Sequence, residues 1–525
     1  MTASFLPLFV AVPLISAALM AVIPSRRLRA AVMLAIPLAT LIGGGLLIWT
    51  TSDGTVLAHN VGLWQTGIAI PFAADMLSAL MLTATSLLIL VSAWFAVVTR
   101  DDVAPFFPSL VAVLSAGVFG ALLTVDIFNL FVFIEVMLLP SYGLIAMTGG
   151  WRRMKAGRLY VTVNLLTSTV YLAGVGLVYG VAGTVHLGEL AATAKEHDLV
   201  AVAAGVMVIA LSVKAAVVPV HGWLTRTYPD TSPAVTALFS GLHTKVAIYA
   251  IYRIYATMFD GDPRYLWIGV VVFSATMLIG VLGAVGESTT RSILVFHMVS
   301  QIGYILFGVA LFTQLGLTAG IFYLIHHMIV KASLFLSTGA VEHTYGTNEL
   351  SQLAGVARRQ PLVGFAFIGA ALSLAGMPPF SGFVAKLSLL MGMAEAREWV
   401  AFAIAIVVSL VTLMSMLKIW GGPFWGGTQP TEQRGAVAAG PTRAGDGSAL
   451  GSRRDSTGGG TGIATVGPTV EAPARVRTAL IAPALVLTGV TLFLGLAGQG
   501  LLALSAQAAD GLLDLTAYLT AVNGL

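Results

Sequence analysis

The stretch that decides the fold is MVIALSVKAAVVPVHGWLTRTYPDTSPAVTALFSGLHTKVAIYAIYR, residues 207–253. It begins as an apolar helix carrying Lys214, is interrupted from Pro219 by a polar segment, and resumes as an apolar helix carrying Lys245. A charged side chain at the bilayer centre costs roughly 3 kcal/mol on insertion scales, so such a residue usually faces a partner or a hydrated path. Unwound backbone at membrane depth is tolerated only where protein buries it or where it lines a cavity. The pattern therefore predicts an ion pathway within a membrane.

The composition of the whole chain agrees with a membrane setting. Of its 525 residues, 57% are hydrophobic and 10% are charged, whereas soluble domains carry about 25% charged residues. The many glycines and prolines suit close helix packing and helix breaks. Because the chain has no cysteine, it cannot supply a disulfide, a cysteine-ligated iron–sulfur cluster or a thiolate zinc site. Its basic residues are not interleaved with aromatic ones, as nucleic-acid binding would require.

Apolar runs of bilayer-crossing length, about 20 residues, predict an all-α polytopic membrane protein with about fourteen transmembrane helices. The runs lie near residues 4–23, 30–49, 74–98, 107–125, 127–147, 159–183, 199–220, 232–256, 264–285, 291–312, 315–340, 361–395, 399–420 and 478–503. Residues 1–106 hold the first three spans and a predicted external β-hairpin at 51–73. Residues 421–477 are predicted to be a flexible cytoplasmic linker. Residues 478–525 hold the last span and an external amphipathic tail.

The placement of Lys and Arg predicts the orientation, because cytoplasmic loops are enriched in them. With both termini outside, 19 of the 27 Lys and Arg residues fall in inside loops. Four fall outside, namely Lys195, Arg253, Arg264 and Arg397. The remaining four fall within spans, namely Lys214, Lys245, Lys331 and Lys386. We expect a multi-pass protein of a bacterial plasma membrane.

A second broken span resembles the first. Residues 361–395 contain the stretch GMPPFSG, with Pro378 and Pro379 at the break and Lys386 after it. The two breaks fall in the seventh and twelfth predicted spans, and interrupted spans at corresponding positions are typical of transporters built from inverted repeats. Residues 107–256 and 257–420 would then be two inverted repeats of five helices each.

Charge counting among the deep ionisable residues predicts proton transfer. Glu135 is the only carboxylate expected in mid-span, since Asp75 and Asp126 lie close to span ends. Four buried lysines face this one glutamate, so even a Glu135–Lys214 pair leaves lysines without a permanent anion. Full burial brings a neutral lysine within reach near pH 7, a state that arginine does not reach. A structural salt bridge or snorkelling to the interface is the alternative for any single lysine.

Histidines and a tyrosine lie in the same predicted spans. His327 and Lys331 are four residues apart and share one helix face, with His326 about a quarter of a turn away. A lone histidine in a span is often a hydrogen-bonded packing residue, which is the alternative for His243 as well. Tyr304 lies where it can hydrogen-bond a water chain. We infer a proton relay that runs laterally through the midplane and is hydrated between its charged groups.

Several motifs together resemble one known family. They are NLFVFIEVMLLPSYGLIA, PVHGWL, TALFSGLHTKVAIYAIYR, RSILVFHMVSQIGYILFG, HHMIVKASLFL and SLAGMPPFSGFVAKL. Over about residues 70–420 the chain is similar to the antiporter-like subunits shared by respiratory complex I and the Mrp-type multisubunit sodium/proton antiporters, most of all to the Mrp D subunits. The resemblance implies fourteen transmembrane helices, a hydrated central axis and a hetero-oligomer. It implies functional residues at Glu135, Lys214, Lys245, His327, Lys331 and Lys386.

The resulting hypothesis is a subunit of a monovalent cation (Na⁺)/proton antiporter, in which protons pass from Glu135 and Lys214 to Lys386. Accessory groups would be His326, Asp126, His243 and Tyr304. Because Na⁺ prefers several hard oxygen ligands, we expect the sodium route in another subunit. Two alternatives stay open, namely a proton-pumping subunit of a redox complex like complex I or a membrane hydrogenase, and a non-transporting scaffold. The chain has no P-loop, His-Glu-x-x-His or Gly-x-Ser-x-Gly motif, so neither an enzyme nor a cofactor or metal site is expected.

Overall fold

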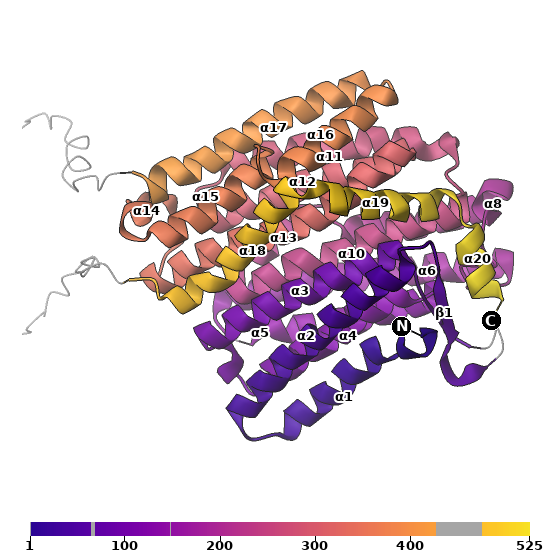
Figure 1. Cartoon of the computed structure of the whole chain (residues 1–525), viewed down its shortest axis with the longest axis horizontal. Coiled ribbons are helices and arrows are strands. Elements are labelled where there is room, and N and C mark those ends of the chain that lie inside the picture. Colours follow the sequence, from indigo (N-terminus) through magenta and orange to yellow (C-terminus); the bar gives the residue numbers. More distant parts are fainter. Residues whose placement is uncertain (1, 65–68, 148, 427–474, 525) are drawn as a thin grey trace, which may run out of the picture.

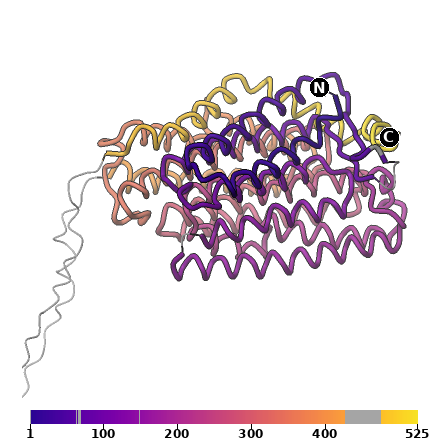
Figure 2. The backbone as a smooth tube through the Cα atoms, turned by 90° about the horizontal axis from the view of Figure 1, so that it is seen from below, coloured from indigo at the N-terminus to yellow at the C-terminus, as the bar shows by residue number. Residues whose placement is uncertain are grey.

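The computed structural model describes residues 2–64, 69–147, 149–426 and 475–524. Within these ranges the chain forms a bundle of helices that run side by side, with a small β-hairpin at one end (Figure 1). The backbone seen from below shows the helices stacked in layers (Figure 2). Both views place the two ends of the described chain toward the same end of the bundle.

The elements follow one another with short connections. The N-terminal part contains α1 (Leu8–Val22), α2 (Arg26–Thr51), β1 (Leu57–Asn60), β2 (Pro71–Ala74) and α3 (Met76–Thr99). Next come α4 (Phe107–Leu123), α5 (Ile127–Ala146), α6 (Trp151–Ala182), α7 (Thr193–Glu196), α8 (Asp198–Lys214), α9 (Gly222–Thr227) and α10 (Pro233–Phe259). They are followed by α11 (Leu266–Gly286), α12 (Thr290–Leu311), α13 (Gln314–Tyr345), α14 (Val356–Arg359), α15 (Pro361–Ala375), α16 (Ser381–Glu395) and α17 (Trp399–Ile419). The last helices are α18 (Thr478–Leu496), α19 (Gly498–Leu513) and α20 (Thr516–Asn523).

Eleven helices in the described part of the chain are long and apolar enough to cross a membrane. They correspond to all the predicted spans except the fourth, seventh and twelfth. The fourth span is α4, with 17 residues. The seventh and twelfth spans are broken, into α8 with α9 and into α15 with α16. The helical class is therefore confirmed, whereas the inverted repeats stay a prediction.

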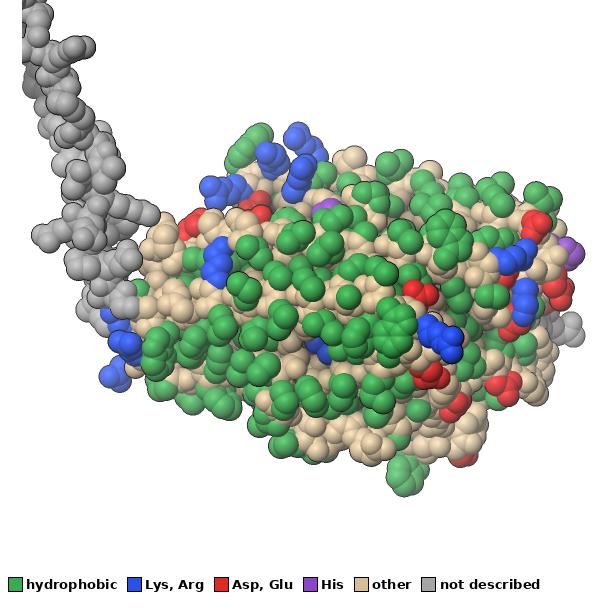
Figure 3. Space-filling model, turned by 90° about the horizontal axis from the view of Figure 1, so that it is seen from above, with side chains coloured by type: hydrophobic (Ala, Val, Ile, Leu, Met, Phe, Trp, Pro, Cys, Tyr) green, Lys and Arg blue, Asp and Glu red, His purple; other side chains and the backbone are tan. Residues whose placement is uncertain are grey.

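The centre of the bundle consists of α10, α12 and α13. The most apolar stretches of α10 and α13 are buried on all sides, whereas only a third of the corresponding stretches of α1, α2, α6, α11 and α17 is buried. Hydrophobic side chains cover the middle of the molecule, and charged side chains gather toward its two ends (Figure 3). A helix buried on all sides directs its polar side chains at other protein groups. The ionisable residues within these fully buried stretches of α10 and α13 therefore face the protein interior.

The hairpin stands beside the start of α3. Strands β1 and β2 pair antiparallel, with Leu57 opposite Ala74, so the hairpin overlaps the predicted stretch 51–73 and ends one residue beyond it. Asp75 follows β2 and caps α3 by accepting a hydrogen bond from the Ser78 backbone N–H at 2.9 Å. Its other oxygen forms an ion pair with Arg253 at 2.7 Å.

This ion pair corrects the predicted place of Arg253, which the charge count puts among the four outside residues although it falls at the end of the predicted span near 232–256. Helix α10 continues to Phe259, and Arg253 within it is only 3% exposed. A buried arginine is tolerated when a carboxylate and further contacts satisfy it. Asp75 supplies the charge, and the Tyr518 ring of α20 lies 4.7 Å from the guanidinium carbon.

Three predicted boundaries also move. The sixth predicted span, near 159–183, is helical already from Trp151, so α6 begins earlier than expected. The first residues of the predicted linker form a helical turn at Trp420–Phe424, where the buried Phe424 ring stacks on Phe367 at 4.3 Å. The rest of that linker, from 427 to 474, lies outside the described residues. The last predicted span ends at Leu496, because the backbone leaves the helical conformation at Ala497 before α19 begins.

Candidate functional site

Three elements bring Glu135 and Lys214 toward each other. Glu135 of α5 is half-buried, and Lys214 is the last residue of α8. Ser168 of α6 stands between them, donating a hydrogen bond to Glu135 Oε1 and accepting one from Lys214 Nζ at 2.9 Å. Glu135 and Lys214 are therefore linked through a hydroxyl group, and no direct ion pair within 4.0 Å joins them in the described structure. Helix α6 packs against both α5 and α8, so its hydroxyl bridges the acid and the amine.

The first break begins directly after Lys214. Its backbone turns through a left-handed conformation at Ala216, with φ of 62°, before the cis peptide bond at Pro219. Side chains supply hydrogen-bond partners for backbone groups at this break. The Val218 N–H donates to Thr276 Oγ1 at 3.2 Å, and Trp223 Nε1 donates to Val213 O at 2.8 Å. Protein groups thus replace the missing helical hydrogen bonds, as unwound backbone at membrane depth requires.

Two accessory residues of the first half have different surroundings. His243 of α10 lies two residues before Lys245, and its Nε2 is 2.6 Å from Ser141 Oγ of α5. Asp126 caps α5 by accepting from the Asn129 backbone N–H at 2.6 Å. Asp126 precedes Glu135 by nine residues, or about 13 Å along a helix. Asp126 therefore lies well away from Glu135, whereas His243 contacts α5, the helix that carries Glu135.

The buried helices α10 and α13 carry the middle residues of the predicted proton relay, which we call the central line and which comprises Glu135, Lys214, Lys245, Lys331 and Lys386. Lys245 and Lys331 are fully buried. The Lys245 amine donates to Thr244 Oγ1 at 3.0 Å, and the Lys331 amine donates to Leu294 O of α12 at 2.7 Å. His327, one turn before Lys331, has no hydrogen-bond partner within the described residues on either ring nitrogen, whereas His326 Nδ1 lies 2.8 Å from Ser381 Oγ.

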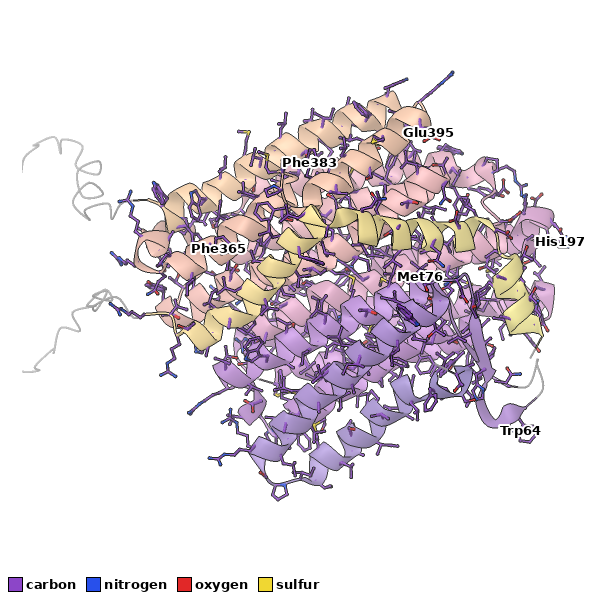
Figure 4. All side chains as sticks on the ribbon, viewed as in Figure 1. Trp64, Met76, His197, Phe365, Phe383 and Glu395 are labelled. Carbon is purple, nitrogen blue, oxygen red and sulfur yellow. The ribbon has the colours of Figure 1, made fainter. Side chains whose placement is uncertain are left out.

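The second break places Lys386 back against the helix that precedes it. Its amine donates to Ala375 O at 2.9 Å and to Ser409 Oγ at 2.6 Å. The Tyr304 ring lies 5.4 Å from this amine, while its hydroxyl donates to Ala405 O. The break turns at Gly376, where φ is 90° and where a Cβ atom would lie 2.6 Å from Lys386 Cδ. Glycine is therefore needed both for the turn and for the space that the lysine occupies. The exposed Phe365 and Phe383 mark the outer faces of α15 and α16 (Figure 4).

The four lysines share one electrostatic property. Within the part of the chain that the structure describes, no carboxylate oxygen lies within 4.0 Å of any of their amines. Each amine donates instead to a neutral hydroxyl or carbonyl. An amine keeps an N–H donor whether or not it carries the extra proton, so these partners are compatible with both protonation states.

Several polar residues of this line were not singled out from the sequence. Ser168 and Ser409 are hydrogen-bonded to the lysines of the two breaks. His297 of α12 is fully buried, and its Nε2 lies 2.9 Å from Ser415 Oγ. The available signal for His297 was a histidine in mid-span, four residues before Gln301. Serines are common where transmembrane helices meet, so neither serine carried a signal of its own.

Comparison with known proteins places this arrangement among its relatives. Residues 124–412 match the family described as NADH:quinone oxidoreductase/Mrp antiporter, transmembrane region. The chain belongs to this family. The matched region of this chain contains every predicted site residue from Asp126 to Lys386.

Individual relatives in the antiporter-like family cover most of the chain. The D subunit of the Na⁺/H⁺ antiporter of Alkalihalophilus pseudofirmus is 33% identical over 469 residues, which is 88% of this chain and 87% of that protein. The corresponding D subunit of Bacillus subtilis is 32% identical over 74% of this chain and 80% of that protein. A chain in the structure of the Mrp complex from Dietzia sp. DQ12-45-1b is 56% identical, covers 100% of both chains and has a TM-score of 0.91. A chain of respiratory complex I from Thermus thermophilus, 21% identical over 97% of this chain and 100% of that chain with a TM-score of 0.76, shows the same fold.

Proposed function

We propose that the chain is the proton-translocating subunit of a hetero-oligomeric Na⁺/H⁺ antiporter, acting as a secondary transporter subunit rather than an enzyme. The observation that carries this proposal is the line of four buried lysine amines with neutral partners, which begins at an acid linked to the first of them through Ser168. A permanent ion pair would hold a proton in place, whereas these partners leave each amine free to exchange one.

The other subunits would cover the outer helices of the bundle. Helices α1, α2, α6, α11 and α17 leave most of their apolar stretches unburied within this chain. These faces suit both lipid and neighbouring membrane subunits. The relatives named as antiporter D subunits, and the Mrp complex whose chain is 56% identical, support a place in such an assembly in a bacterial plasma membrane. The positive-inside rule supports placing both termini outside.

The proton path would begin at Glu135 and end at Lys386. A proton on Glu135 removes the negative charge that Lys214 senses across the Ser168 hydroxyl, which weakens the attraction of the amine for its own proton. The released proton moves to Lys245 and Lys331, and from there to Lys386 at the second break. Sodium would cross elsewhere in the complex, and Na⁺ density coordinated beside Glu135 would overturn that division.

The test uses the complete purified complex, reconstituted into vesicles in which added Na⁺ drives a pH change reported by a dye. Glu135→Gln keeps the side-chain shape and removes the acid, so we expect antiport to fall by about a hundredfold or more, the scale on which a lost proton-transfer group acts. Lys195→Gln is the control, because this lysine is 47% exposed and pairs with Asp260 at the surface. Wild-type antiport by an intact Glu135→Gln complex would overturn the proposal and favour a scaffold.

A proton-pumping subunit of a redox complex is the second candidate, because the family includes NADH:quinone oxidoreductase subunits. The partners of the isolated complex distinguish the two. Iron–sulfur or flavin subunits that co-purify with this chain would select the redox complex, whereas membrane-only partners would select the antiporter.

A further inference from the structure

A continuous chain of side-chain hydrogen bonds leads away from His326. His326 Nδ1 of α13 lies 2.8 Å from Ser381 Oγ, in the first turn of α16. Ser381 Oγ lies 2.6 Å from Thr491 Oγ1 of α18, and Thr491 Oγ1 lies 2.7 Å from Ser373 Oγ of α15. These are ordinary lengths for hydrogen bonds between such groups. Helices far apart in the sequence thus share one row of three hydroxyl groups that starts at a histidine.

All four side chains are completely buried, each with 0% exposure. The second ring nitrogen of His326, Nε2, is also buried and has no hydrogen-bond partner within the described residues. Gly382 permits the close approach of these groups, since a Cβ atom there would lie 1.7 Å from Ser373 O and 3.1 Å from His326 Cε1. The half-helix α16 therefore packs tightly enough to hold the row together.

The row has two possible directions, which the state of His326 selects. If Nδ1 carries a hydrogen, it donates to Ser381, Ser381 donates to Thr491, and Thr491 donates to Ser373. If Nδ1 is the acceptor, every one of these hydrogen bonds reverses. A proton that arrives at Nε2 allows the Nδ1 proton to move to Ser381. The hydroxyl protons of Ser381 and Thr491 then move one position along, and the hydroxyl proton of Ser373 passes to the Lys386 amine in its neutral form, so that one proton enters the row and one leaves it.

The far end of the row reaches the second break. Ser373 lies in the last turn of α15, two residues before Ala375, whose carbonyl accepts from the Lys386 amine. The row therefore starts on the buried helix that carries Lys331 and ends at the helix terminus where Lys386 is held.

We propose that His326, Ser381, Thr491 and Ser373 form a proton wire between the central line and the second break, so that the last transmembrane helix takes part in transport through Thr491. This inference rests on the proposed proton-translocating function and deepens it. His326, rather than His327, is then the histidine that passes protons toward Lys386.

Thr491→Val in the complete reconstituted complex tests the wire, because it removes the hydroxyl and keeps a side chain of similar size. We expect the maximal rate of Na⁺-driven proton flux to fall about tenfold or more, with the Na⁺ concentration for half-maximal flux unchanged. Thr491→Ser restores the hydroxyl and should recover most of the rate. Thr488→Val is the matched control, since Thr488 lies three residues earlier on α18, is equally buried and bonds to Ser333 outside the row. It should transport as the wild type does.

The possible outcomes separate the wire from the function on which it rests. If the wild type transports, Glu135→Gln does not, and Thr491→Val matches Thr488→Val, the wire is wrong and the proposed function stands. If Thr491→Ser is as slow as Thr491→Val, Thr491 acts through packing and the wire is also wrong. If intact Glu135→Gln complex transports like the wild type, the proposed function itself is wrong.

Discussion

The two broken helices solve the same problem with different chemistry. In the first, Lys214 is the last residue of α8; in the second, Lys386 follows the break but returns its amine to Ala375, the last residue of α15. Lys214 thus stands at a helix C-terminus, and the Lys386 amine binds a carbonyl at a helix C-terminus, where the aligned peptide dipoles favour a positive charge. The first break adds an acid behind the Ser168 hydroxyl, whereas the second offers the Ser409 hydroxyl and no carboxylate within 4.0 Å in the described residues.

This difference separates two tasks. At the first break a change of charge on Glu135 alters the environment of Lys214, so that end can respond to an arriving proton. At the second break only neutral groups hold the amine, so that end can release a proton without separating a buried ion pair. Asp75 and Arg253 show the opposite arrangement, because the buried Arg253 guanidinium forms a direct ion pair with the Asp75 carboxylate at 2.7 Å. This pair has a structural role.

The turns of the two breaks give the largest expected contrast. Gly376→Ala should lower stability by about 2–4 kcal/mol, because a left-handed alanine costs about 1–2 kcal/mol and the new Cβ would overlap Lys386 Cδ. Ala216→Gly at the first break should change stability by no more than about 1 kcal/mol, since relief of the left-handed strain is offset by the entropy of glycine. The thermal midpoint of the detergent-purified complex measures both. Gly180→Ala is the control, as nothing lies within 4 Å of the added methyl group. Equal effects of Gly376→Ala and Gly180→Ala would contradict this account of the second break.

The two serines give a smaller contrast. Ser168→Ala removes the only group that links Glu135 to Lys214 in the described structure, so we expect antiport to fall about tenfold. Ser409→Ala should cost no more than about twofold, because Lys386 keeps Ala375 O as its acceptor. Initial rates of Na⁺-driven pH change in vesicles, normalised to the amount of assembled complex, compare the two. A larger loss for Ser409→Ala would reverse the roles assigned to the two breaks.

The sequence was sufficient for the features that each segment carries by itself. The apolar runs, the prolines and the lysines of both breaks predicted the membrane fold and the candidate line. Partners that come from distant segments could not be predicted. Ser168 is 33 residues from Glu135 and 46 from Lys214, and Thr491 is 110 residues from Ser381. The sequence alone counts Arg253 among the outside residues, because its burial depends on Asp75, which is 178 residues away.

Lys386→Arg tests the central claim most directly, because arginine keeps the positive charge but does not release its proton near neutral pH. The measurement is Na⁺-driven proton flux by the complete reconstituted complex, with Lys195→Arg at the surface as the matched control and subunit composition as the check on assembly. We expect Lys386→Arg to assemble and to lose at least about nine-tenths of the flux, while Lys195→Arg transports normally. Wild-type flux through an assembled Lys386→Arg complex would show that Lys386 acts only as a fixed charge, and would contradict the account.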